Sequence, residues 1–264
     1  MLVVLKNNYE ENSREAARMV ATAVRNNPAL TLGLATGATM LGMYQELVRL
    51  HKKERLSFSR VVTFNLDEYF GLAADHPESF HYFMRENFFA HVNIKPANTH
   101  IPGGKISGDY EKYCASYEKS IRRAGGIDLQ ILGIGRNGHI GFNEPTSSLA
   151  SRTRLKVLNE ETLEDNRKSF SSGEEIPRCA ITMGIGTILE AKKVILLATG
   201  AAKADAVAKA IEGPITSSLT ASALQLHPDV TFILDEEAAS KLTQRDYYRQ
   251  VLEMTKLYTP SRLE

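Results

Sequence analysis

Short apolar runs alternate with amphipathic helical segments along most of the chain. The first pair is the β-branched run at 1–6 and the helical pattern at 9–27, which stops before Pro28. The same alternation predicts strands at 29–37, 60–66, 127–134, 192–200 and 229–236, and helices at 39–53, 79–92, 108–126 and 201–213. Strands that are apolar almost throughout and separated by helices are typical of a parallel sheet covered on both faces. We therefore expect a single doubly wound, Rossmann-like α/β domain over residues 1–264, with a mostly parallel sheet.

The bulk composition narrows the class of protein. The formal net charge is +1 and the two signs are interspersed, so we expect neither a nucleic-acid nor a membrane partner. Only two cysteines occur, Cys114 and Cys179, without a CxxC motif, which argues against a disulfide framework or a structural zinc site. The start of the chain lacks a signal-peptide pattern, and no apolar stretch has the length of a membrane span. These features predict a cytoplasmic protein without a bound metal.

Two segments are candidates for binding an anion at the carboxyl ends of strands, where ligands bind in an open parallel sheet. The turn Thr36-Gly37-Ala38-Thr39 ends a strand, and Thr39 is placed to cap the next helix, so hydroxyls and backbone N–H groups would face a phosphate. Lys203 lies in the first turn of a later helix, where its charge opposes the helix dipole unless it serves an anion. The plainer alternatives are an ordinary turn with a threonine cap and a solvated lysine.

A candidate base follows another strand end. Asp67 and Glu68 come directly after the apolar strand 60–66, and Gly71 marks the turn beyond them. A carboxylate at this position lies at the rim of a cleft, where desolvation can tune it as a base. The alternative is a turn-forming aspartate that bonds its own backbone, and this stretch alone leaves both open.

The segment LQILGIGRNGHIGFNEP, residues 129–145, contains the G-x-G-x-x-G spacing of a dinucleotide-binding turn. Such a turn requires a helix to start at its third glycine, here Gly138, but no helix of that length fits the glycine- and proline-containing residues that follow. The segment therefore gives little support for NAD.

What the segment does present is Asn137, His139 and Glu144 close together. An imidazole held by a carboxylate beside an amide suits proton transfer near neutral pH. A loop histidine bonded only to backbone is the commoner alternative. The remaining histidines lack such a neighbourhood and are expected to be structural or surface residues: His51, His76, His81, His91, His100 and His227.

Several segments together resemble the glucosamine-6-phosphate deaminase family, from the first strand to about Asp235. The resemblance is carried by FNLDEYFGL (64–72), HPESF (76–80), GIGRNGHIGFNEP (133–145), SSLASRTR (147–154) and LQLHPD (224–229). It implies the conversion of glucosamine 6-phosphate and water into fructose 6-phosphate and ammonia, without metal or redox cofactor. By the same resemblance, Asp67 matches the base that moves a proton between C2 and C1, His139 matches the group that opens the sugar ring, and Asn137 and Glu144 match its partners.

The resemblance also covers the phosphate contacts. The Thr36–Thr39 loop and Lys203 match phosphate-binding elements, although many family members have a proline where this chain has Met40. An arginine that the family carries near an N-S-R-F-F sequence is replaced by NRKSF at 166–170, so that either Arg167 or Lys168 could take its role.

Some members of the family are hexamers that N-acetylglucosamine 6-phosphate activates at a subunit interface. Ser147, Arg154 and Lys156 match residues of that effector site, whereas the C-terminal segment 244–264 has no clear match. Homo-oligomerisation and activation therefore stay open. Three rival functions are a lactonase, an isomerase that retains the amine, and a sugar-phosphate sensor. The sensor is disfavoured because no DNA-binding segment or basic patch accompanies this domain.

Overall fold

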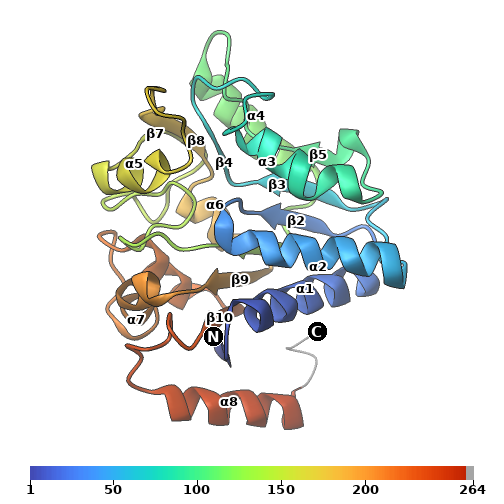
Figure 1. Ribbon diagram of the computed structural model, residues 1–264, viewed down its shortest axis with the longest axis vertical. Coiled ribbons are helices and arrows are strands. Elements are labelled where there is room, and N and C mark those ends of the chain that lie inside the picture. The colour runs from blue at the N-terminus through green and yellow to red at the C-terminus, as the bar shows by residue number, and fades with distance from the viewer. Residues whose placement is uncertain (260–264) are drawn as a thin grey trace.

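A computed structural model describes residues 1–259 of the chain; residues 260–264, the end of the C-terminal segment discussed above, lie outside it. The centre of the molecule is a seven-stranded sheet in the order β1-β10-β9-β6-β2-β3-β5 (Figure 1). All neighbouring strands of this sheet pair in parallel. The strands are β1 (Leu2–Lys6), β2 (Thr31–Leu34), β3 (Val62–Asn65), β5 (Thr99–His100), β6 (Leu129–Leu132), β9 (Lys193–Ala198) and β10 (Val230–Asp235). The predicted parallel α/β fold is confirmed.

Helices connect these strands. They are α1 (Tyr9–Asn26), α2 (Ala38–Glu54), α3 (Phe80–Asn87), α4 (Tyr110–Arg123), α6 (Ile185–Leu189) and α7 (Ala204–Glu212), with α8 (Arg245–Tyr258) along the β1 edge (Figure 1). Because crossovers between parallel strands are right-handed, α1, α2 and α3 cover one face of the sheet and α4, α6 and α7 the other. The sequence explains both ends of α1. At its start the side chain of Asn8 accepts a hydrogen bond from the Glu11 N–H, and at its end the helix stops before Pro28.

A second, smaller sheet was not predicted. It is antiparallel and has the order β4-β8-β7, from β4 (Asp67–Tyr69), β8 (Cys179–Thr182) and β7 (Arg154–Val157). Together with α5 (Glu160–Arg167) it encloses a separate apolar cluster: Tyr69, Phe142, Leu158, Leu163, Phe170, Ile176 and Ala180. The strands are three or four residues long, too short for periodicity to reveal.

The direction of the chain reverses between β2 and β6. From β2 the chain moves outward through β3 to β5, and from β6 it moves the opposite way through β9 to β10. The connections after β2 and β6 therefore leave on opposite faces, and open parallel sheets bind ligands at the carboxyl ends of the strands at such a point. The adjacent strands β9, β6, β2 and β3 carry at those ends the four segments that the sequence singled out.

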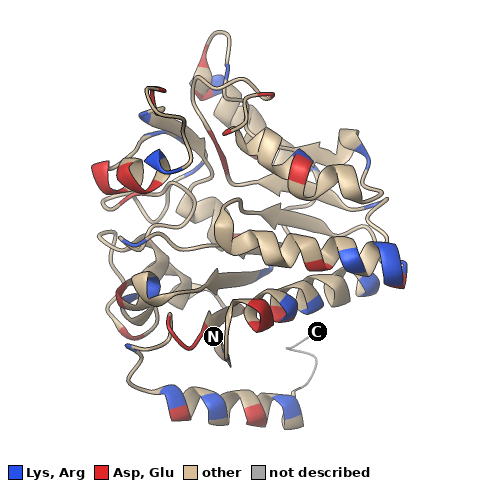
Figure 2. Ribbon diagram, viewed as in Figure 1, with Lys and Arg blue, Asp and Glu red and all other residues tan. Residues whose placement is uncertain are grey.

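Basic and acidic residues are interspersed along the outer helices (Figure 2). In the described residues, no helix has the length and apolar character needed to cross a membrane.

Candidate active site

Residues 133–153 run from β6 to β7 as loop and turns throughout. The glycines of this loop serve the histidine rather than a nucleotide. A Cβ on Gly135 would lie 2.3 Å from His139 Cε1, so only glycine leaves room for the imidazole ring. Gly138 has φ +83° and packs against Leu219, which holds the turn before the histidine. The prediction that no crossover helix follows Gly138 is confirmed.

Asn137, His139 and Glu144 come together as predicted. Asn137 Nδ2 donates to Glu144 Oε2 at 2.9 Å, and the His139 backbone N–H donates to Asn137 Oδ1 at 3.1 Å. His139 Nδ1 lies 3.4 Å from the same Glu144 oxygen, within ion-pair range when the ring is protonated. Burial alone would raise the pKa of Glu144, but its interactions with His139, Thr162 and Asn137 outweigh burial and lower the pKa to about 2. Glu144 is therefore an anion throughout the neutral range.

Asp67 begins β4 and is buried, with 7% of its surface exposed. Burial, and secondarily the charge of Glu68, raise its pKa to about 8. It is paired with Thr182 in the small sheet rather than placed in a turn. Gly141, at φ +55°, lies against the side chains of Asp67 and Thr182. A Cβ on it would be 3.0 Å from Thr182 Oγ1 and 3.4 Å from Asp67 Oδ2. The loop that carries His139 thus passes directly against the Asp67 carboxyl group.

The Thr36–Thr39 segment differs in one detail from the prediction. Gly37, with φ +107°, occupies the N-cap of α2 and no side chain caps the helix, so Thr39 lies in the first turn instead of capping it. In the part of the chain that the structure describes, the N–H groups of Ala38 and Thr39 have no hydrogen-bond partner. Unpaired N–H groups at the start of a 17-residue helix favour an anion.

Lys203 ends the single 3-10 turn Ala201–Lys203 after β9, directly before α7. It is half-buried, and burial lowers its pKa; the nearby positive charge of Arg136 acts in the same direction. The carboxylates of Asp165 and Glu161 act in the opposite direction, so Lys203 lies in a partly desolvated place among charges of both signs. Arg136, to which sequence reasoning gave no role, also donates to Asp165 of α5 at 2.8 Å. The substituted pair Arg167 and Lys168 is exposed at the end of the same helix.

The three residues matched to an effector site lie in the loop 133–153 or in β7, which follows it. The Ser147 backbone N–H donates to the Glu144 carbonyl at 3.0 Å, and its side chain is buried. Arg154, the first residue of β7, donates to Asn143 Oδ1 at 2.9 Å, and burial lowers its pKa. Lys156 is two residues further along β7 and therefore on the same face.

Buried polar residues that the sequence did not reveal hold the loop in shape. Asn143 Nδ2 donates to the carbonyls of Ile140 and Met183, and Thr182 Oγ1 accepts from the Phe142 N–H. Asparagine and threonine are common in loops and strands, so nothing in the sequence distinguishes these two from others.

An open α/β sheet whose strand-end segments bring an imidazole and carboxyl groups to its topological switch point defines the general class. The family model for glucosamine-6-phosphate isomerases and 6-phosphogluconolactonase matches residues 7–232. The chain belongs to this family, as its sequence motifs predicted.

Proteins named glucosamine-6-phosphate deaminase are similar to this chain over most of its length. Glucosamine-6-phosphate deaminase of Thermoanaerobacter pseudethanolicus is 53% identical over 246 residues, which cover 93% of this chain and 97% of the relative. The enzyme of that name from Clostridium botulinum is 54% identical over 242 residues, covering 92% and 99%. The solved structure of a monomeric glucosamine-6-phosphate deaminase matches with a TM-score of 0.89 and 49% identity, covering 91% of this chain and 99% of that one. A 6-phosphogluconolactonase from Trypanosoma brucei, at 22% identity and a TM-score of 0.72 over 92% and 98%, shares the fold.

Proposed function

We propose that this protein is a glucosamine-6-phosphate deaminase, which converts glucosamine 6-phosphate and water into fructose 6-phosphate and ammonia. The observation that carries the proposal is the contact between two strand-end segments. Asp67 Oδ2 lies 3.4 Å from the Cβ position of Gly141, two residues from His139. The loop that carries His139 therefore passes against the Asp67 carboxyl group, and we assign both side chains to one site. The deaminases that are 53–54% identical to this chain support the choice of substrate.

His139 opens the sugar ring in this proposal. The substrate is a cyclic hemiacetal, so a proton must pass from the anomeric hydroxyl to the ring oxygen before C2 can react. An imidazole performs such a transfer at neutral pH because it can both accept and donate. The Glu144 carboxylate, 3.4 Å from His139 Nδ1, stabilises the imidazolium formed in transit, and Asn137 fixes the carboxylate.

Asp67 carries out the isomerisation. It removes the proton from C2 of the open-chain aldehyde while the C1 carbonyl oxygen gains a proton from water, which gives an enol-amine. It then returns the C2 proton to C1, which gives a protonated C2 imine. Water adds to the imine carbon, ammonia leaves with the amine nitrogen, and the C2 ketone of fructose 6-phosphate remains. A carboxyl group whose pKa is raised to about 8 by burial and by Glu68 is a stronger base than an exposed aspartate. The same base can therefore take the proton from C2 and return it to C1.

The phosphate is bound at a distance from the reacting carbons. We assign it to the N-terminus of α2, with the Thr36–Thr39 loop, and to Lys203, because both offer unsatisfied donors or positive charge at the same edge of the sheet. Binding energy gained there holds C1 and C2 against Asp67. Arg167 is the last residue of α5 and Lys168 follows it, so a phosphate contact from either residue would come from the end of that helix.

A coupled assay tests the proposed reaction. Purified protein is incubated with glucosamine 6-phosphate, and ammonia and fructose 6-phosphate are measured together. We expect equal amounts of both products and no hydrolysis of 6-phosphogluconolactone. Consumption of the lactone without formation of fructose 6-phosphate would assign the chain to the lactonase branch of its family. Formation of an isomerised sugar that keeps its nitrogen would indicate the amine-retaining isomerase.

We also propose cytoplasmic amino-sugar catabolism as the setting, and an effector role for Ser147, Arg154 and Lys156. The same assay with N-acetylglucosamine 6-phosphate tests that role, together with sedimentation of the protein to determine its oligomeric state. The effector hypothesis predicts a lower KM for the substrate when the acetylated sugar is present. An unchanged KM would refute it.

A further inference from the structure

Glu68 lies directly behind Asp67 in β4. Successive side chains of a strand point to opposite faces, so Glu68 faces away from the His139 loop. It is buried, with 1% of its surface exposed. A buried carboxylate is costly unless other groups satisfy it. The mechanism proposed above does not use this residue.

The start of α3 supplies those groups. The backbone N–H groups of Tyr69 and Phe80 donate to Glu68 Oε1 at 2.8 and 3.0 Å, and that of His81 donates to Oε2 at 3.0 Å. The His81 side chain completes the set, with Nδ1 2.8 Å from Oε2. Hydrogen bonds from a helix N-terminus and an imidazole hold a carboxyl group in one orientation. His81 is therefore hydrogen-bonded to a buried carboxyl group, that of Glu68, which its neighbours in the sequence did not reveal.

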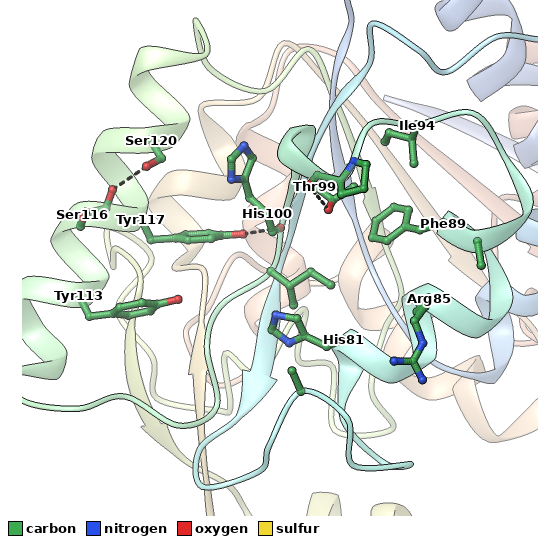
Figure 3. A pocket seen from close by; sticks show the side chains of 14 residues that line it. His81, Arg85, Phe89, Ile94, Thr99, His100, Tyr113, Ser116, Tyr117 and Ser120 are labelled. Carbon is green, nitrogen blue, oxygen red and sulfur yellow. Dashed lines mark hydrogen bonds between the residues drawn. The ribbon is translucent and has the colours of Figure 1, made fainter.

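The far side of His81 faces a cavity of about 630 Å³ between α3, α4 and β5 (Figure 3). The other charged or titratable residues lining this cavity are Arg85 of α3, His100 of β5, and Tyr113 and Tyr117 of α4. Arg85 is engaged by Glu86, and the His100 ring stacks on Phe64. Among the residues that line the cavity, only His81 is hydrogen-bonded to Glu68.

We infer that Glu68 and His81 form a positioning pair for Asp67, in which the charge of Glu68 strengthens Asp67 as a base and His81 holds Glu68 in place. This inference rests on the proposed function, since Asp67 is the base there. The pair touches no substrate. It acts by fixing β4 to the start of α3 and by placing a second negative charge next to the reacting carboxyl group, which favours the protonated form of Asp67.

Two substitutions with distinct signatures test the pair. Glu68→Gln removes the charge but keeps an acceptor, so the acidic limb of the pH profile of kcat/KM should move about one unit lower. His81→Leu removes one donor to Glu68 and should lower kcat about fivefold, the worth of one hydrogen bond, at unchanged KM. His81→Asn, whose amide nitrogen occupies the position of Nδ1, should restore most of kcat. His100→Leu is the matched control, from the same cavity, and should leave kcat and the pH profile unchanged.

An unmoved pH limb in Glu68→Gln, or a His81→Asn variant as slow as His81→Leu, would overturn the inference while leaving the proposed reaction intact. A wild-type protein that releases no ammonia would instead overturn the reaction. The pair remains testable in that case by ¹³C-carboxyl NMR of aspartate-labelled protein, with the Asp67 signal assigned from Asp67→Asn. The midpoint of Asp67 should then fall in Glu68→Gln, and an unchanged midpoint counts against the pair.

Discussion

Replacing Asp67 by asparagine should stabilise the folded protein, and the gain should grow with pH. The carboxyl group is buried, and burial together with Glu68 raises its pKa from the ordinary 3.8 to about 8. The folded chain must therefore retain a proton that the unfolded chain has released. Asparagine is nearly the same size and never ionises, so the variant escapes this penalty. A functional residue that destabilises its own fold is common at active sites.

The sign and size follow from the two pKa values. Below about pH 4 the group is protonated in both states and the penalty is absent. Between pH 4 and 8 the unfolded state is ionised while the folded state holds its proton, so the free energy of unfolding falls by up to about 1.4 kcal/mol per pH unit. Over the three pH units from pH 5 to pH 8, the difference in free energy of unfolding between Asp67→Asn and wild type should therefore grow by at most about 4 kcal/mol.

Urea unfolding of wild type and Asp67→Asn at pH 5 and pH 8 measures this difference. Asp205→Asn serves as the control, because Asp205 is exposed and its pKa is lowered by Lys241, so it cannot show a gain that grows with pH. A gap between wild type and Asp67→Asn that is the same at both pH values would refute the conclusion that Asp67 is held protonated by its surroundings.

Three further substitutions probe the site. Glu144→Gln removes the anion beside His139 and should lower kcat about a hundredfold in steady-state assays, with KM little changed; an equal loss in kcat for an open-chain substrate analogue would argue against a role in ring opening. Lys203→Ala should raise KM about tenfold at similar kcat, and an unchanged KM would remove it from the phosphate site. Gly141→Ala puts a Cβ 3.0 Å from Thr182 Oγ1 at a positive φ, so chemical denaturation should show a loss of about 1–3 kcal/mol, and full stability would contradict the close approach.

Six strands of the parallel sheet were predictable because they lie within recognisable apolar runs, whereas the edge strand β5, two residues long with the sequence Thr-His, was missed. The small antiparallel sheet was not predictable, since β4 and β7 are three and four residues long and β7 is only partly buried. Long-range pairing with β8 makes these segments strands, and no local pattern encodes it. The same limit hid α5, whose eight residues are mostly charged or polar.

The catalytic candidates were recognisable because Asn137, His139 and Glu144 lie within eight residues of one another. Their convergence with Asp67 depends on the order of the strands, which places β3 two positions from β6. The hydrogen bond between His81 and Glu68 was not predictable. The two residues are thirteen positions apart, and the start of α3 that brings them together is defined only by the fold.

Ammonia release by Asp67→Asn, measured beside calorimetric binding of glucosamine 6-phosphate, tests the role of the buried carboxyl group most directly. The account predicts that the rate falls at least about a thousandfold while the sugar phosphate still binds with near wild-type affinity. A variant that turns over at close to the wild-type rate would contradict it.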